Sequence, residues 1–183
     1  MKASAGSVYT VYNQYLKRYT ACQVAYIAPP DTVSKESWAV ILSLDWVGDA
    51  PLTAEELPHL HPLYKDFMYW PRDLHPLRVP VEIPPQYTLV GTLPPFTDQP
   101  CRSYGGWNDG YEVYRQIKWQ EIPEERRRAF KEAMESDGEP EIGGIPVKVS
   151  SHRLMDKYLP FGSARGLEAL PCRPDPISER GPP

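Results

Sequence analysis

Three histidines come nearest to the residue types and spacing of a metal site. His59, His61 and His75 lie close together in the sequence, and Asp66 and Asp73 are their neighbours. A His-x-His pair on an extended chain can direct two imidazoles at one ion, so this cluster would suit a metal-dependent hydrolase. Two of the histidines, however, stand in Leu-His-Pro-Leu sequences, which are typical of proline-fixed loops that pack apolar side chains. We therefore predict no metal and no cofactor, with the hydrolase as the alternative.

Patterns for nucleophilic or nucleotide chemistry are weak. The sequence has no Gly-x-Ser-x-Gly turn. Its three cysteines are far apart and lack CxxC spacing, which predicts free thiols at Cys22, Cys101 and Cys172. The glycine-rich stretch 105–110 lacks the Gly-Lys-Ser/Thr ending of a phosphate-binding loop. No catalytic residue can be named, and we predict that the chain is not an enzyme.

The same glycine-rich stretch offers two roles to its tryptophan. Trp107 stands between Gly106 and the polar pair Asn108 and Asp109. A large aromatic ring on such a turn can be a hot spot for a protein partner. Alternatively, the stretch is a hairpin turn from which Trp107 folds back onto the core. We favour the core role.

Length and composition indicate one folded, acidic chain. A length of 183 residues suits a single domain. The 22 prolines are more than twice the usual share of roughly 5% and must occupy loops and strand edges. A formal net charge of −4 argues against a general nucleic-acid binder and favours a basic protein partner. Residues 1–7 carry no secretory signal and no stretch approaches the roughly 18 apolar residues of a membrane span, so we expect a cytoplasmic location and no membrane contact.

Short runs rich in valine, tyrosine and threonine predict a mainly β fold. Residues 8–12 and 20–28, with a polar stretch between them, predict a hairpin. Residues 38–46 alternate large apolar groups with smaller ones, which places one face in the core: Trp38, Val40, Leu42, Leu44 and Trp46. The further predicted strands are 67–70, 79–83, 87–93, 111–119 and 147–150. Five tyrosines crowd the hairpin, and we expect a core position for most of them: Tyr9, Tyr12, Tyr15, Tyr19 and Tyr26.

Helical signals are few. Thr53 and Glu56 have capping-box spacing, but Pro58 limits that helix to about one turn. Pro123 and the acidic residues after it begin the one main helix, about 123–136. We predict a β-rich α+β fold, either a strongly bent antiparallel sheet or a small barrel. The single domain would span 1–159, and 160–183 would form a proline-rich tail.

Two motifs resemble a known family. Residues 6–11 read Gly-Ser-Val-Tyr-Thr-Val, and residues 84–91 read Pro-Pro-Gln-Tyr-Thr-Leu-Val-Gly. With Gln23-Val24-Ala25-Tyr26, they make the chain similar to bacterial polymorphic-toxin immunity proteins of immunity family twenty-six over about residues 6–119. The resemblance implies a small β-rich protein that binds and neutralises a cognate toxin domain by protein contact. It supplies no catalytic residue.

An acidic inhibitor can be steered onto a basic toxin, such as a nuclease-type domain, and anchored by aromatic side chains. We therefore expect the partner-binding surface on acidic and aromatic loop positions. The first set is Trp107, Asp109 and Tyr104. The second set is Asp45, Asp49, Tyr69 and Trp70.

Overall fold

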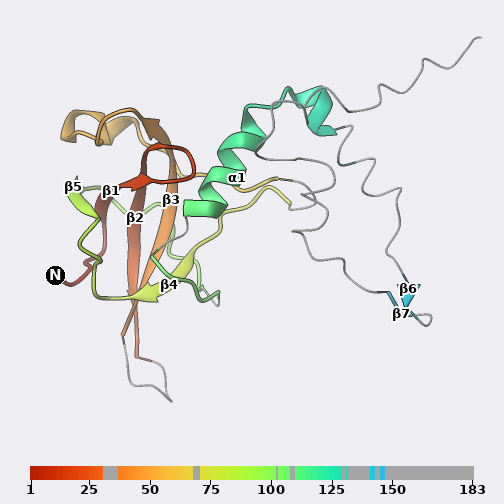
Figure 1. The fold of residues 1–183 in the computed structure, drawn as a ribbon. Helices are drawn as coiled ribbons and strands as arrows, with labels where there is room; N and C mark the ends of the chain where they lie inside the picture. The colour runs from red at the N-terminus through yellow and green to blue at the C-terminus, as the bar shows by residue number, and fades with distance from the viewer. Residues whose placement is uncertain are drawn as a thin grey trace, which may run out of the picture. The chain divides into compact units, whose positions relative to one another are not determined.

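An open antiparallel sheet of five strands forms the centre of the N-terminal part of the chain (Figure 1). In the computed structural model, the residues described are 1–30, 37–67, 71–101, 103–107, 110–128, 131, 141–142 and 145–146. The strands are β1 (Ser7–Asn13), β2 (Arg18–Ala28), β3 (Trp38–Gly48), β4 (Leu77–Pro80) and β5 (Thr88–Thr92), in the order β4-β3-β2-β1-β5. The predicted β-rich class and antiparallel sheet are confirmed. The sheet is not closed into a barrel, because β4 and β5 lie at its two edges.

The chain divides into two compact units, Met1–Arg127 and Arg128–Pro183. The five-stranded sheet belongs to the first unit. In the second unit, β6 (Glu141–Ile142) pairs with β7 (Ile145–Pro146). The predicted strand 147–150 and the predicted tail 160–183 lie outside the described residues. No helix in the described part of the chain is long and apolar enough to cross a membrane.

The predicted N-terminal hairpin is confirmed, and one asparagine shapes its turn. β1 pairs with β2 from Val8 opposite Gln23 to Asn13 opposite Arg18. The Asn13 Oδ1 atom accepts hydrogen bonds from the backbone N–H of Tyr15 (3.0 Å) and Leu16 (3.2 Å). Asparagine is favoured in turns because its side chain can bond the backbone two residues on.

Both faces of the sheet are buried, so the prediction of one core face on β3 is incomplete. All six residues from Ala39 to Leu44 are buried. On one face, Leu44 packs with Leu57 of η1 (Ala54–His59), a 3₁₀ helix opened by the predicted capping box. On the other face, Ile41 packs with Trp107. Loops cover both faces of this sheet, so residues on both faces are buried. The alternation of large and small side chains in the sequence does not show this second buried face.

The predicted strand 111–119 is wrong: these residues belong to α1 (Gly110–Gln120), the longest helix among the described residues. Its buried positions include Val113, Gln116 and Trp119. That spacing of three fits a helix face, whereas the apolar residues at every second position suggested a strand. Of the predicted helix 123–136, residues 124–128 and 131 are helical, Pro123 is described but not helical, and the others lie outside the described residues.

The remaining strand predictions have mixed outcomes. Strand 87–93 is confirmed as β5, while the strand predicted at 79–83 is β4, which begins at Leu77 and ends at Pro80. For the strand predicted at 67–70, only Phe67 is described, and it lies outside any strand. Cys22 and Cys101 are free and buried, as predicted, whereas Cys172 is not described.

Candidate functional site

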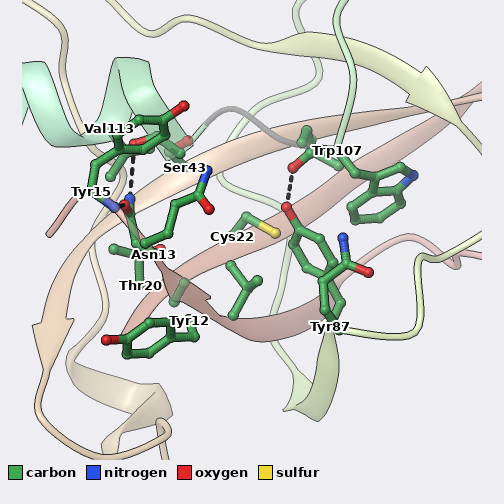
Figure 2. Close-up of a pocket in the computed structure, with 15 residues that line it drawn as sticks. Tyr12, Asn13, Tyr15, Thr20, Cys22, Ser43, Tyr87, Trp107 and Val113 are labelled. Atoms are coloured by element: carbon green, nitrogen blue, oxygen red, sulfur yellow. Dashed lines mark hydrogen bonds between the residues drawn. The ribbon is translucent and has the colours of Figure 1, made fainter. Parts of the chain in front are cut away.

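A pocket of about 400 Å³ lies on the face of the sheet that carries Trp107 (Figure 2). Its floor comes from the first three strands, one wall from the start of α1, and the opposite wall from the stretch before β5 together with Trp107. The floor residues are Val11, Thr20, Ala21, Cys22, Ile41 and Ser43. The walls and mouth are formed by Tyr12, Asn13, Gln14, Tyr15, Gln86, Tyr87, Trp107, Gly110 and Val113.

The described part of the pocket lining consists of neutral side chains. All fifteen described lining residues are apolar, aromatic, amide, hydroxyl or thiol groups, and none of these fifteen is an acid, lysine, arginine or histidine. This lining resembles binding pockets, which are mostly apolar with a few polar groups that set orientation.

Asn13 joins the hairpin to the helix at one end of the pocket. Its Nδ2 atom donates to the backbone carbonyl of Gly110 at 2.8 Å (Figure 2). Its Oδ1 atom is already occupied by the turn, so this one side chain fixes the hairpin tip and the start of α1 together. The pocket is therefore held open by bonds within the protein.

Trp107 forms the opposite wall and has the core role. Only 5% of it is exposed, and its indole N–H donates to the carbonyl of Pro80 at 2.8 Å. The hydroxyl of Tyr87 donates to the Trp107 carbonyl (Figure 2), and Tyr9 meets the indole ring edge-on at 6.0 Å. Trp107 thus contributes a fixed wall to the pocket and is no exposed hot spot.

Two groups of packed tyrosines lie at the hairpin tip and the start of α1, and we call them together the tyrosine rim. Its members are Tyr12, Tyr15, Tyr19, Tyr111 and Tyr114. Tyr12 and Tyr15, which line the pocket, are 52% and 44% exposed. Tyr12 packs edge-on against Tyr19 at 5.4 Å, and Tyr15 against Tyr111 at 5.2 Å. Tyr111 stacks on Tyr114, and burial raises the pKa of the Tyr114 phenol above its ordinary value.

Two mistakes in the sequence prediction hid the tyrosine rim. Among the hairpin tyrosines, Tyr9 is buried as expected, but Tyr12 and Tyr15 are exposed. The hairpin prediction itself placed Tyr15 in the turn, where exposure is usual. Tyr111 and Tyr114 were assigned to a strand, and only the helix brings them beside Tyr15.

Of the described residues that were predicted to bind a partner, only Trp107 lines the pocket. Tyr104 is 56% exposed and packs against Trp38 (5.4 Å) and Arg78. Asp45 and Asp49 are exposed, and Asp49 pairs with Arg18 at 2.7 Å. The other three predicted residues lie outside the described residues: Asp109, Tyr69 and Trp70.

The three histidines of the alternative function do not assemble a metal site. His59 and His61 are exposed, whereas His75 is half-buried beside Lys65. Within the described ranges, no three His, Cys, Asp or Glu side chains are grouped so that they could hold a metal ion. The spacing in the sequence suggested a metal site because a His-x-His pair can chelate an ion. In the structure, the histidines of the two Leu-His-Pro-Leu segments lie in different surroundings, one exposed and one half-buried.

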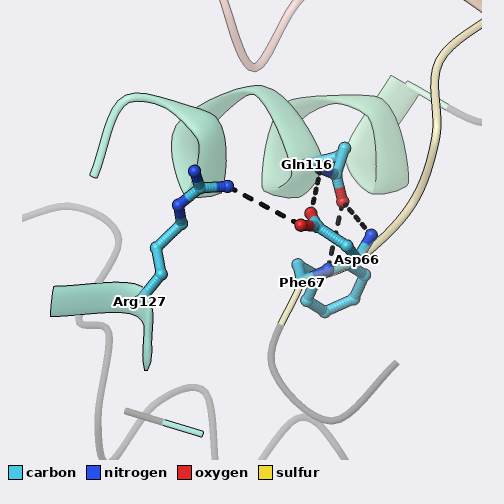
Figure 3. A network of polar contacts seen from close by, with 4 residues as sticks. All are labelled: Asp66, Phe67, Gln116 and Arg127. Carbon is cyan, nitrogen blue, oxygen red and sulfur yellow. Dashed lines mark hydrogen bonds and ion pairs between the residues drawn. The ribbon is translucent and has the colours of Figure 1, made fainter. Parts of the chain in front are cut away.

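A buried glutamine fixes α1 to the loop before β4 (Figure 3). The Gln116 Oε1 atom accepts from the backbone N–H groups of Asp66 (3.0 Å) and Phe67 (3.2 Å). Its Nε2 atom donates to Asp66 Oδ1 at 2.8 Å. The other oxygen of Asp66 pairs with Arg127 at 3.6 Å. This network sets where α1 lies, and so where Val113 and Tyr111 meet the pocket and the tyrosine rim.

His75 gives the fold a pH dependence. Burial, and secondarily the charge of Lys65, lower the pKa of His75 below its ordinary value, although Glu112 and Asp73 act in the other direction. Lys65 Nζ lies 3.2 Å from His75 Nδ1. A lysine ammonium group has only donors to offer, so Nδ1 must accept, and the folded state favours the neutral ring.

We therefore expect stability to fall on acidification from pH 7.5 to 5.5. Above the unfolded pKa of about 6.5, both states are neutral at His75 and the residue contributes nothing. Below it, His75 takes up a proton in the unfolded chain but stays neutral in the folded chain, until the pH reaches the lower pKa of the folded state. Urea unfolding at several pH values should show a weaker decline in His75→Asn than in wild type. The exposed control His59→Asn should keep the wild-type decline, and an unchanged slope in His75→Asn would contradict the assignment.

No protein-family model, curated protein or solved structure matches the chain.

Proposed function

We propose that this chain works by binding a protein partner at the pocket and the tyrosine rim, and that the partner is a bacterial toxin domain which it neutralises. The observation that carries the proposal is a pocket whose described lining is uncharged and includes two half-exposed tyrosines, Tyr12 and Tyr15. Tyrosine is enriched in protein interfaces because its ring buries a large apolar area while its hydroxyl keeps a hydrogen bond.

The tyrosine rim is also pre-organised. Tyr12, Tyr15 and their neighbours are held by ring contacts between 5.2 and 6.1 Å, and Asn13 fixes the turn that carries Tyr15. A side chain that is already ordered loses less conformational entropy when a partner binds. The same residues can therefore anchor a complex more tightly than mobile tyrosines on a loop.

A toxin is proposed as the partner because of the resemblance to immunity proteins. The two motif segments that carry it lie side by side: β1 pairs with β5, with Val8 opposite Gly91 and Tyr9 opposite Leu89. Gly6, which opens the first motif, has a φ of 82°, and a Cβ there would lie 2.7 Å from the Leu93 carbonyl oxygen. These positions have a structural reason to occur together, which supports treating them as one motif. The net charge of −4 favours a basic toxin met in the cytoplasm.

Co-expression tests this proposal. The toxin domain encoded by the gene adjoining this one would be produced in bacteria with and without the chain. We expect growth to be arrested by the toxin alone and restored by the pair, and the purified proteins to form a one-to-one complex by light scattering. Continued arrest, together with no complex at micromolar concentration, would contradict toxin neutralisation.

A further inference from the structure

We propose that the partner fills the pocket with one uncharged aromatic side chain. This inference rests on the proposed function and adds the chemistry of the anchor. It follows from three properties of the described lining: it carries no charge, several of its polar groups already make hydrogen bonds within the protein, and its walls contain aromatic rings.

The lining disfavours a charged occupant. None of the fifteen described residues carries a charge that could form an ion pair with a buried guanidinium, ammonium or carboxylate group. A charge that leaves water without a partner is strongly destabilising. An arginine or lysine of a basic toxin is thus better placed outside the pocket, and a neutral side chain inside it.

Several polar groups of the wall already have partners. The amide of Asn13 bonds the turn and Gly110, the Tyr87 hydroxyl bonds the Trp107 carbonyl, and the Trp107 indole bonds Pro80. These groups present little unmet hydrogen-bonding capacity to an occupant. Between them lie apolar surfaces of Val11, Ile41 and Val113, which gain from covering by another apolar group.

The walls also favour a ring. Trp107, Tyr87 and Tyr15 border the same space of about 400 Å³. Aromatic rings add roughly 0.5 to 1.5 kcal/mol per pair beyond the area buried when they meet edge-to-face or offset. The exposed amides of Gln14 and Gln86 lie at the mouth, where they can bond the partner's backbone.

Amino-acid probes test this inference without the toxin. The methyl groups of Val11, Ile41 and Val113 would be followed by NMR while N-acetyl-phenylalaninamide, N-acetyl-argininamide or free phenylalanine is added. We expect saturable shifts with the capped phenylalanine, at a dissociation constant in the millimolar range. The capped arginine should bind at least tenfold more weakly, because its charge finds no partner. Free phenylalanine should also bind more weakly, since it brings two charges to a neutral pocket.

Variants show whether the tyrosine rim takes part. Tyr15→Ala, at a half-exposed position, should weaken the binding of the capped phenylalanine at least fivefold. The exposed control Tyr104→Ala should leave that affinity unchanged. Equal or tighter binding of the capped arginine, or no shift with any probe, would overturn the inference. Tighter binding of free phenylalanine would also overturn it, by marking a small-molecule site. Because the probes need no toxin, these failures are separate from a failure of growth rescue.

Discussion

Gln116→Leu is expected to lower the free energy of unfolding by about 3 to 5 kcal/mol. Gln116 is fully buried and bonds the N–H groups of Asp66 and Phe67 and one oxygen of Asp66. Leucine has a similar volume but no polar atoms, so two backbone donors and a carboxylate oxygen lose their partner. Each buried group left unsatisfied costs about 1 to 3 kcal/mol. Urea unfolding followed by circular dichroism measures the loss.

The matched control is Gln120→Leu, at the exposed end of the same helix. It makes the same chemical change without a buried partner, and its effect should stay within about 0.5 kcal/mol. A loss below about 1 kcal/mol in Gln116→Leu would mean that the network of Figure 3 does not hold α1 in place.

Replacing Tyr12 and Tyr15 together by alanine is expected to weaken toxin binding by a hundredfold or more. Truncation of an aromatic hot spot typically costs 2 kcal/mol or more, and a hundredfold change corresponds to about 2.7 kcal/mol. Both side chains are about half exposed, so the fold should remain intact by circular dichroism and thermal unfolding. Titration calorimetry with the toxin domain gives the affinity of each variant.

A second pair of exposed tyrosines supplies the control for that measurement. Tyr64 and Tyr104 are 38% and 56% exposed, but neither lines the pocket. The Tyr64→Ala, Tyr104→Ala variant should bind within about threefold of wild type. A loss in this pair as large as in the Tyr12, Tyr15 pair would place the interface elsewhere.

The strands of the sheet were predictable because their signals are local. The hairpin of β1 and β2, the alternation in β3 and the proline-bounded β5 each follow from valine, tyrosine and threonine content or from turn residues. The capping box of Thr53 and Glu56 depends on four adjacent residues, and both of its bonds form. In contrast, the order of apolar and polar residues in α1 fits both the period of a strand and the period of a helix. The buried Gln116 of this helix bonds Asp66, which lies 50 residues away in the sequence.

The candidate site was less predictable because it depends on distant pairs. The bond of Asn13 to Gly110 joins positions 97 residues apart, and Tyr87 meets Trp107 across 20 residues. The core position of Trp107 was predicted from its turn, but its hydrogen bond to the carbonyl of Pro80 was not. The tyrosine rim needs both the hairpin and α1, so an error in the second element concealed half of it.

Amide hydrogen exchange of the chain, alone and in complex with its proposed toxin partner, tests the central claim most directly. It requires no mutation and reports every backbone N–H at once. Binding at the pocket and the tyrosine rim predicts slower exchange in residues 12–20 and 110–115 and little change in β4 and residues 103–105. Protection confined to β4 and 103–105, with unchanged exchange at the hairpin tip and the start of α1, would contradict it.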